Sequence, residues 1–263
     1  MKARQGMVGK TAQTQTNRGV PVAERIRPSK ISFVIPALNE EGVVGATVRS
    51  IPVEQLRAQG LDVEVIVVDN ASTDDTAAEA RQAGATVVRE ERRGYGNAYI
   101  AGLRAATGDI VVMSDADGTY PVEDTRSLIE PLLQGDADLV TGSRFNGKIE
   151  DGAMPWLHRY IGNPLLTLTQ NLLFGTRLSE THCGFRAVSR AALERMSLRS
   201  PGMEFAHEML VEAVKRKLRI SEVPIVYRRR AGGRAKLSSF RDGWRHVSFL
   251  IGRFLAERTG RGD

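Results

Sequence analysis

Two aspartates, Asp115 and Asp117, stand one residue apart directly after the apolar run Ile110 to Met113. Side chains alternate along a strand, so we expect both carboxylates to point the same way at the end of a strand over 109–114. Two hard oxygen ligands suit Mg²⁺ or Mn²⁺ held jointly by the protein and a diphosphate. The pattern favours nucleotide-sugar chemistry over generic nucleotide binding. The alternative is that the carboxylates only cap a turn.

Two more polar clusters follow apolar runs earlier in the chain. Residues 36–41 (PALNEE) come after the run 31–35, and Asp69 and Asn70 come after the run 63–68. Short β-branched runs predict further strands at 86–88, 138–141 and 220–227, with helices between them that end near 50, 83, 106 and 134. This alternation predicts an α/β fold, a Rossmann-like, mostly parallel sheet with helices on both faces. The three clusters should then meet at the carboxyl edge of the sheet, where ligands bind.

Composition restricts the partners and the compartment. The 263 residues carry a net charge of +6, which favours anionic partners such as nucleotide phosphates or a phospholipid surface. The single cysteine, Cys183, allows no internal disulfide, which fits a reducing cytoplasm. The four histidines show no metal-ligand spacing, so no structural zinc site is predicted. Residues 1–29 are polar and are expected to form a flexible tail, not a secretory signal, and no apolar run is long enough to span a membrane.

The last segment has helical spacing of large apolar residues with arginines between them. Two interpretations remain open: an amphipathic helix that packs on the domain, or one that lies in a membrane interface. Residues 155–174, which contain Trp156 and Tyr160, form a second candidate for membrane contact. The C-terminal pattern consists of Phe240, Trp244, Val247, Ile251 and Phe254.

Seven short segments occur in a fixed order along the chain: 34–41 (VIPALNEE), 67–74 (VVDNASTD), 115–117 (DAD), 142–144 (GSR), 183–186 (CGFR), 208–210 (EML) and 230–236 (RAGGRAK). This ordered set resembles family 2 glycosyltransferases of GT-A fold, and specifically the dolichol-phosphate mannosyltransferase-like group of polyprenyl-phosphate glycosyltransferases. The resemblance extends from about Ile31 to Leu237, which suggests a tail at 1–29, a GT-A domain at 30–237 and a C-terminal amphipathic helix and tail at 238–263.

The resemblance implies a role for each matched residue. The donor would be a nucleotide-diphosphate sugar of GDP-mannose or UDP-glucose type, and the acceptor a polyprenyl (dolichyl or undecaprenyl) phosphate; no nucleic-acid partner is expected. The enzyme would sit peripherally on the cytoplasmic face of the membrane. The implied nucleotide-sugar site comprises Pro36, Glu40, Asp69, Asp115, Ala116, Asp117, Arg230 and Lys236. Within it, Asp115 and Asp117 would hold the metal, and Asp117, Arg230 and Lys236 would be catalytic. The implied acceptor-phosphate contacts are Arg144 and Arg186.

Three positions depart from the family pattern. Thr119 stands where a glutamine is common as a further metal ligand, so the third protein ligand of the metal is undetermined. Ala235 replaces the serine before the final lysine. Glu180 replaces an aspartate that often precedes the acceptor motif, which keeps the charge on a longer side chain.

The expected reaction is a single inverting displacement at the anomeric carbon. A phosphate monoester is already anionic near neutral pH and needs no general base. A soluble glycosyltransferase with a hydroxyl acceptor is the main alternative, and it would need a carboxylate base such as Glu180 or Glu208. A processive polysaccharide synthase and a non-enzymatic adaptor are weaker alternatives. A dinucleotide-dependent dehydrogenase is suggested only by Gly94 and Gly96, because Tyr99 occupies the place of the third glycine.

Overall fold

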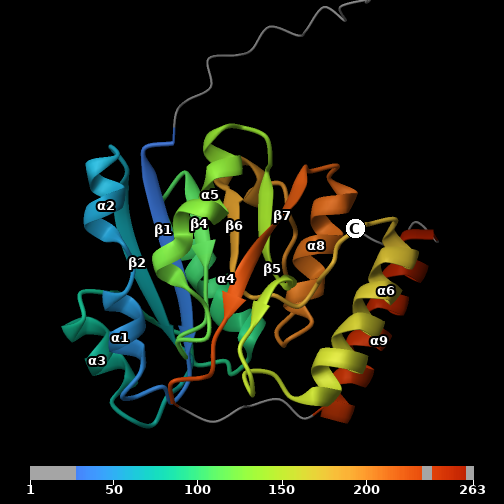
Figure 1. Cartoon of the computed structure of the whole chain (residues 1–263), viewed down its shortest axis with the longest axis horizontal. Helices are drawn as coiled ribbons and strands as arrows, with labels where there is room; N and C mark the ends of the chain where they lie inside the picture. Colours follow the sequence, from blue (N-terminus) through green and yellow to red (C-terminus); the bar gives the residue numbers. More distant parts are fainter. Residues whose placement is uncertain (1–27, 233–238, 259–263) are drawn as a thin grey trace, which may run out of the picture.

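The chain forms one twisted sheet with helices on both faces (Figure 1). The computed structural model describes residues 28–232 and 239–258. Within these residues the sheet has seven strands in the order β3-β2-β1-β4-β6-β5-β7, and β6 alone is antiparallel to its neighbours. The strands are β1 (Lys30–Ala37), β2 (Asp62–Asp69), β3 (Thr86–Arg89), β4 (Ile110–Met113), β5 (Leu139–Ile149), β6 (Arg186–Ser189) and β7 (Ile220–Tyr227).

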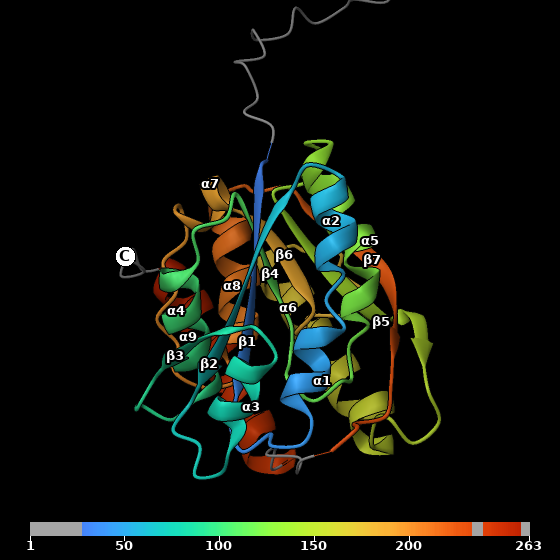
Figure 2. The ribbon, with the colours of Figure 1, turned by 90° about the vertical axis from the view of Figure 1, so that its left-hand side faces the viewer.

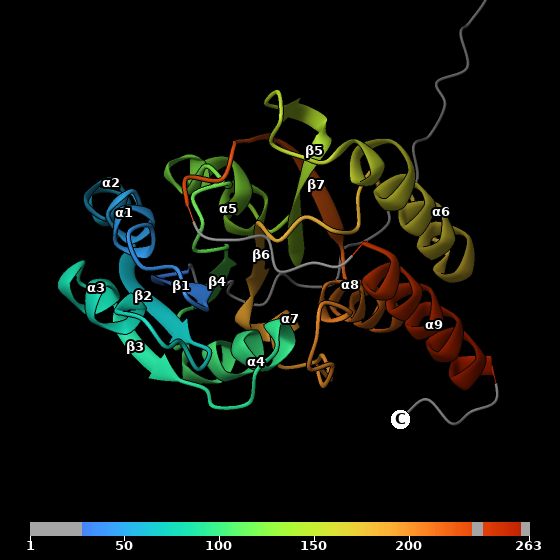
Figure 3. The same cartoon turned by 90° about the horizontal axis from the view of Figure 1, so that it is seen from below.

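Helices cover both faces of the sheet (Figures 2 and 3). Two apolar cores fill the spaces between the sheet and these helices. One core lies against α1 (Val44–Arg49), α2 (Val53–Ala58), α3 (Thr76–Gln82) and α5 (Thr125–Leu133). The other lies against α4 (Tyr95–Ala105), α7 (Arg190–Leu193) and α8 (Phe205–Lys215). A short 3₁₀ turn, η1 (Val122–Asp124), leads into α5. The predicted mostly parallel sheet covered on both faces is therefore confirmed.

Strand β1 continues through Pro36, although the prediction ended it at Ile35. Pro36 stands in register with Val68 of β2, and the pairing of β1 with β4 has already ended at Val34. A proline without an N–H is tolerated here because β1 has no ladder partner on its β4 side at this point. The strand end thus carries Pro36 to the carboxyl edge of the sheet.

Strand β6 was not predicted from the sequence. It is four residues long, and it pairs with both β4 and β5. Strand β5 is longer than the predicted strand at 138–141, since it continues to Ile149 across an irregularity after Ser143. A Cβ at Gly147 would lie 2.0 Å from the carbonyl oxygen of Ile225, so only glycine allows β7 to approach so closely.

The predicted C-terminal helix is present as α9 (Ser239–Arg258), and it lies beside α6 (Asn163–Phe174) at the end of the molecule farthest from β3 (Figure 3). A π-helical turn, η2 (His158–Gly162), precedes α6. Rings of Phe174 and Phe254 meet edge to face between the two helices. Among the described residues, no helix is long and apolar enough to cross a membrane.

Charge complementarity fixes α9 on α8. Glu204, Glu208 and Glu212 recur every four residues and so share one face of the chain at the start of and along α8. Arg245 pairs with Glu204 at 3.1 Å, and Arg253 pairs with Glu208 and Glu212 at 3.3 and 3.2 Å. Glu208 and Glu212 are buried, so solvent weakens the attraction in these ion pairs less than it does in surface pairs.

Candidate active site

The loops that follow β1 and β2 are joined by hydrogen bonds at the carboxyl edge of the sheet. Asn39 has a φ of 51°, and its side-chain oxygen accepts from the backbone N–H of Thr73 at 2.9 Å. The N–H of Asn39 donates to the Ser72 hydroxyl at 3.0 Å, and the N–H of Glu40 donates to the Thr76 hydroxyl at 2.8 Å. These contacts hold the buried side chain of Glu40 at the strand ends.

Asp69 closes β2, and its carboxylate is buried. It accepts from the Ser72 N–H at 3.0 Å and pairs with Arg89 at 2.5 Å. The neighbouring Asn70 ties the next loop to the same edge, since its side-chain oxygen accepts from the N–H of Gly94 at 2.8 Å. Asp69 was predicted at this edge of the sheet, but Arg89 was not. Arg89 directly follows the predicted strand at 86–88, and this position could have suggested it.

Asp117 and Glu40 share one guanidinium. Arg230 Nη2 pairs with Asp117 Oδ2 at 2.7 Å, and Arg230 Nη1 lies 3.5 Å from Glu40 Oε1. The other oxygen of Asp117 accepts from the backbone N–H and the hydroxyl of Thr119, at 3.0 and 2.6 Å. Thr119, which replaces the usual glutamine, therefore orients the Asp117 carboxylate. Ala116 between the two aspartates is buried, and its carbonyl accepts from the Thr47 hydroxyl at 2.9 Å.

Asp115 is half-buried, and one of its oxygens accepts from the Tyr95 hydroxyl at 3.2 Å. Burial and the negative charge of Asp117 raise the pKa of Asp115 to about 7, against the opposing effect of the nearby positive charges of Arg230 and Arg144. At neutral pH the positive charges of the protein therefore do not fully balance a negative charge on Asp115 in addition to the one on Asp117.

The donor set fits a hard divalent cation. Glu40, Asp115 and Asp117 bring three carboxylates to this edge, and Arg230 pairs directly with two of them. Carboxylate oxygens are preferred ligands of Mg²⁺ and Mn²⁺, and a dication beside Asp115 would supply the positive charge that its raised pKa indicates is lacking.

The loop 181–185 approaches Asp115 directly. A Cβ at Gly184 would lie 2.8 Å from the Tyr95 hydroxyl oxygen and 3.3 Å from Asp115 Oδ2, so glycine is needed for this close approach. The N–H of Gly184 donates to the Tyr120 hydroxyl oxygen at 2.8 Å. Tyr95 and Tyr120 were not predicted as site residues. Their positions in the sequence could have suggested them, because Tyr95 lies between Gly94 and Gly96 and Tyr120 closely follows Asp117.

Arg186 is buried, and its guanidinium bonds to backbone carbonyls. Nε donates to Cys183, Nη1 to Ala206 and Nη2 to Thr181, at distances of 2.7 to 2.9 Å. These contacts tie the loop to the start of α8. The acceptor-phosphate role that we predicted for Arg186 remains a prediction, but the three carbonyls indicate that this side chain positions the loop.

Arg144 is also buried, beside the fully buried Glu180. Its Nε and Nη2 donate to one oxygen of Glu180, the first at 2.6 Å, and its backbone N–H donates to the other at 2.8 Å. The guanidinium carbon lies 4.8 Å from the centre of the Tyr227 ring. The longer side chain of Glu180 thus forms a buried ion pair with Arg144.

Gly94 and Gly96 pack against the backbone of another loop. The dehydrogenase interpretation required these glycines to bind the phosphates of a dinucleotide instead. A Cβ at Gly96 would lie 1.9 Å from the Ser200 carbonyl oxygen, and one at Gly94 would lie 2.3 Å from the Pro201 carbonyl oxygen. Both glycines are therefore explained by the close packing of the loop before α8 on the start of α4. Among the other predicted site residues, Lys236 lies outside the described residues.

Comparison with known proteins agrees with this arrangement. Residues 32–197 match the family model described as glycosyl transferase family 2. The chain belongs to this family. A hexosyltransferase of low-salt glycan biosynthesis, Agl6 of Haloferax volcanii, is 44% identical over 224 residues, which cover 84% of this chain and 53% of that protein. The chain therefore spans about half the length of this relative.

Two further proteins are similar to this chain, one in sequence and one in structure. A dolichyl-phosphate hexose transferase of Haloferax volcanii is 33% identical over 213 residues, 81% of this chain and 89% of that protein. Glucosyl-3-phosphoglycerate synthase of Mycobacterium tuberculosis, crystallised with Mn²⁺, uridine diphosphate and phosphoglyceric acid, is 30% identical with a TM-score of 0.65 and covers 89% of this chain and 80% of that one. The predicted GT-A fold and glycosyltransferase activity are thereby confirmed.

Proposed function

We propose that this family 2 glycosyltransferase transfers a hexose, with inversion, from a nucleotide-diphosphate sugar to a polyprenyl phosphate in a metal-dependent reaction. The observation that carries the proposal is the cluster of Glu40, Asp115, Asp117 and Arg230 at the carboxyl edge of the sheet, where Gly184 packs against Asp115. Relatives named for dolichyl-phosphate substrates support the acceptor class. The donor is of GDP-mannose or UDP-glucose type.

The donor would lie along the ends of β1, β2 and β4. Pro36, Glu40 and Asp69 would contact the nucleoside, and the backbone at Ala116 would contact the sugar nucleotide between the two aspartates. Asp115 and Asp117 would hold Mg²⁺ or Mn²⁺, which when bound supplies positive charge to the diphosphate. Arg230 would then contact the donor phosphates, together with Lys236.

The acceptor phosphate provides its own nucleophile. One of its anionic oxygens forms a bond to the anomeric carbon, while the bond from that carbon to the diphosphate oxygen breaks and its electron pair leaves with the nucleoside diphosphate. No proton has to be removed from the nucleophile, so no carboxylate base is required. Arg230 stabilises the charge that develops on the leaving diphosphate.

Arg144 and Arg186 have different roles in this proposal: Arg144 would contact the acceptor phosphate, and Arg186 would position the loop 181–185. Arg144 lies close enough to Asp115 for its charge to act on that carboxylate, and it is the guanidinium that we assign to the acceptor phosphate. Arg186 is assigned as a positioning residue. Arg186→Lys should lower kcat for transfer and for metal-dependent hydrolysis of the donor alike, because a compact ammonium cannot reach the three carbonyls that three separate guanidinium nitrogens contact. A rise confined to the acceptor KM would instead assign Arg186 to the phosphate.

The surface of α6 and α9 supports peripheral membrane contact. Every large hydrophobic side chain that is exposed in the described residues lies within 156–172 or on α9. Trp244 and Leu172 are the most exposed on the two helices, at 73% and 75%. Amphipathic helices with tryptophan at the exposed face bind in the membrane interface. We place this face on the cytoplasmic leaflet, where a polyprenyl phosphate would be presented.

Liposome flotation tests this contact. Trp244→Ser and Leu172→Ser should each reduce the fraction of protein that floats with vesicles containing anionic lipid, by several-fold in the double variant. Gln55→Ser, on an exposed position of α2 across the sheet, is the matched control. Unchanged flotation of the double variant would remove the proposed membrane face.

A donor panel tests the reaction. GDP-mannose, UDP-glucose and UDP-N-acetylglucosamine are each supplied with a polyprenyl phosphate in detergent and Mg²⁺ or Mn²⁺, and label in the organic phase is counted. One donor should give label that chelator abolishes, and Asp115→Ala should remove it from a folded protein. Activity retained in Asp115→Ala would contradict the metal role.

A soluble acceptor is the second candidate, and the likeness to glucosyl-3-phosphoglycerate synthase favours it. That synthase was crystallised with a small phosphorylated acid, which also presents an anion to the site. In the donor panel, metal-dependent donor hydrolysis without organic-phase label would favour this candidate. Adding phosphoglyceric acid and finding a water-soluble labelled product would establish it.

A further inference from the structure

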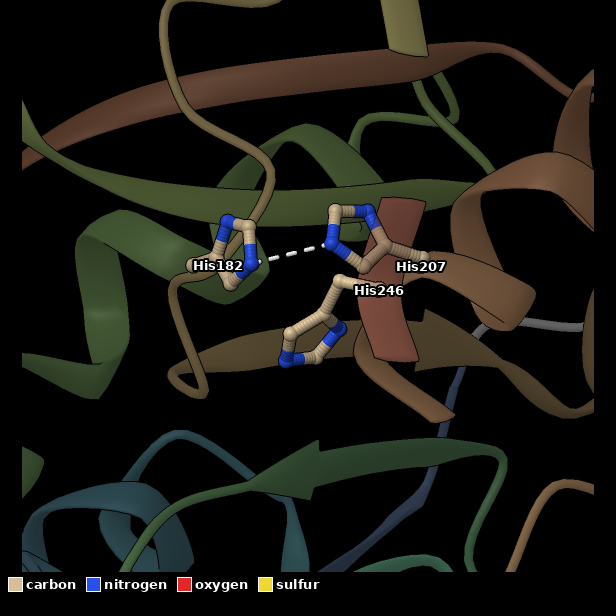
Figure 4. Close-up of side chains that lie close together, drawn as sticks. All are labelled: His182, His207 and His246. Atoms are coloured by element: carbon tan, nitrogen blue, oxygen red, sulfur yellow. Dashed lines mark hydrogen bonds between the residues drawn. The ribbon is translucent and has the colours of Figure 1, made fainter. Parts of the chain in front are cut away.

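Three of the four histidines of the chain meet in one cluster (Figure 4). His182 comes from the loop 181–185, His207 from α8 and His246 from α9. The prediction of no zinc site rested on the absence of a local spacing motif, and it did not foresee this cluster because its members are brought together only by tertiary packing.

The three imidazoles lie close enough to share a ligand. His182 Nε2 and His207 Nε2 face each other at 2.9 Å, and one nitrogen from each of the three rings lies within 4.8 Å of the others. The ring centres are 4.3 to 5.1 Å apart. His207 and His246 are buried and His182 is half-buried.

The surroundings of His207 fix which nitrogen is available. Its Nδ1 is hydrogen-bonded to the side-chain oxygen of Gln170, which is itself fully buried on α6. An amide oxygen can only accept, so Nδ1 carries the proton and Nε2 presents a lone pair toward His182. A histidine whose second nitrogen donates to a carbonyl-type oxygen is the usual arrangement of a metal ligand.

We propose that His182, His207 and His246 bind one zinc-class transition-metal ion, separate from the magnesium or manganese site at Asp115 and Asp117. Imidazole nitrogens select Zn²⁺ and its neighbours, whereas carboxylates select hard cations. Tetrahedral Zn²⁺ at 2.0–2.1 Å from each nitrogen sets neighbouring nitrogens about 3.3 Å apart, so the rings need to move by only about an ångström. The inference does not depend on the acceptor or donor proposed above.

The charge of the cluster agrees with this assignment. Burial and the neighbouring rings hold the pKa of His182 and of His207 well below the ordinary value, so both are in the neutral, metal-binding form at neutral pH. The charges of Arg144 and Arg186 also lower the pKa of His182. The ion would join α9, α8 and the loop 181–185 through one centre.

The test uses protein purified without a polyhistidine tag and stripped with chelator, in an Asp115→Asn background that removes the carboxylate site. Co²⁺ titration should give visible d–d absorption that saturates at one ion per chain, and Zn²⁺ at a hundredfold excess over Kd should raise Tm by about 5–10 °C. His207→Gln and His246→Gln should lose both signals, and His158→Gln, which changes the histidine outside the cluster, should keep them.

Two results would overturn the proposal. The first is a Tm of the Asp115→Asn protein that neither Co²⁺ nor Zn²⁺ changes, with no visible cobalt spectrum. The second is a spectrum and stoichiometry that persist in His246→Gln. If a histidine variant does not fold, which circular dichroism in chelator reveals, the cobalt spectrum and stoichiometry of the parent protein still decide the question.

Discussion

Replacing Asp115 by asparagine removes the negative charge of the side chain but keeps its shape. The amide has almost the same volume, and its oxygen can still accept from the Tyr95 hydroxyl that lies 3.2 Å from Asp115 Oδ1. The substitution removes the negative charge that lies buried beside Asp117. Two opposite effects should follow: loss of activity, and a gain in stability without metal.

The gain can be worked out from the pKa. Asp115 titrates at about 7 in the folded protein and near 3.8 in an unfolded chain. Between these values the folded state holds a proton that the unfolded state has lost, so stability falls as pH rises from about 4 to about 7. The difference sets an upper limit of about 4 kcal/mol, and because Asp115 is only half-buried we expect about 1–3 kcal/mol.

Thermal melts in chelator between pH 4 and pH 8 measure this effect. Asp115→Asn should melt roughly 3–10 °C above the parent protein at pH 8 and within error of it at pH 4. Adding Mn²⁺ should raise Tm of the parent and leave the variant nearly unchanged. Asp151→Asn, at an exposed turn, is the control for loss of a carboxylate. A variant that is less stable than the parent at pH 8 in chelator would refute the reasoning.

Three further substitutions probe the same region. Gly184→Ala places a methyl group 2.8 Å from the Tyr95 hydroxyl oxygen, and we expect transfer to fall more than tenfold, with a loss of about 1–3 kcal/mol in urea unfolding. Arg144→Ala leaves the carboxylate of Glu180 buried and unpaired, which should cost about 3–5 kcal/mol; adding Glu180→Gln should recover part of it, and no recovery would argue against the pair. Arg253→Ala removes the bridge from α9 to two glutamates of α8, so trypsin should cut α9 at least several-fold faster, and an unchanged rate would show that the bridge does not hold the helix.

The sequence predicted those parts of the fold that depend on local periodicity. The runs in β1, β2 and β4 are apolar and end in polar residues, so their strand character and the position of Glu40, Asp69 and Asp115 at one edge followed from the rule for parallel sheets. Strand β6 could not be predicted in this way. Its four residues begin at Arg186, whose charge suggested a ligand contact, and their antiparallel pairing with β4 and β5 is set by tertiary structure.

Charged residues inside motifs were the hardest to interpret from sequence. A guanidinium can donate to a phosphate or to a set of backbone carbonyls, and only the fold shows that Thr181, Cys183 and Ala206 direct their carbonyls at Arg186. The histidines pose the same problem. His182, His207 and His246 are separated by 25 and 39 positions, so their meeting depends on the packing of α9 on α8.

The loop 181–185 is where these features meet. Gly184 brings it against Asp115, Arg186 ties it to the start of α8, and His182 ties it to His207 within that helix. The same helix carries the glutamates that hold α9, whose outer face is apolar and exposed. The contacts of α8 thus connect α9 to the loop 181–185. On our proposal, the helix that binds the membrane and the loop beside the donor site are joined through α8, and the histidine cluster lies at the junction.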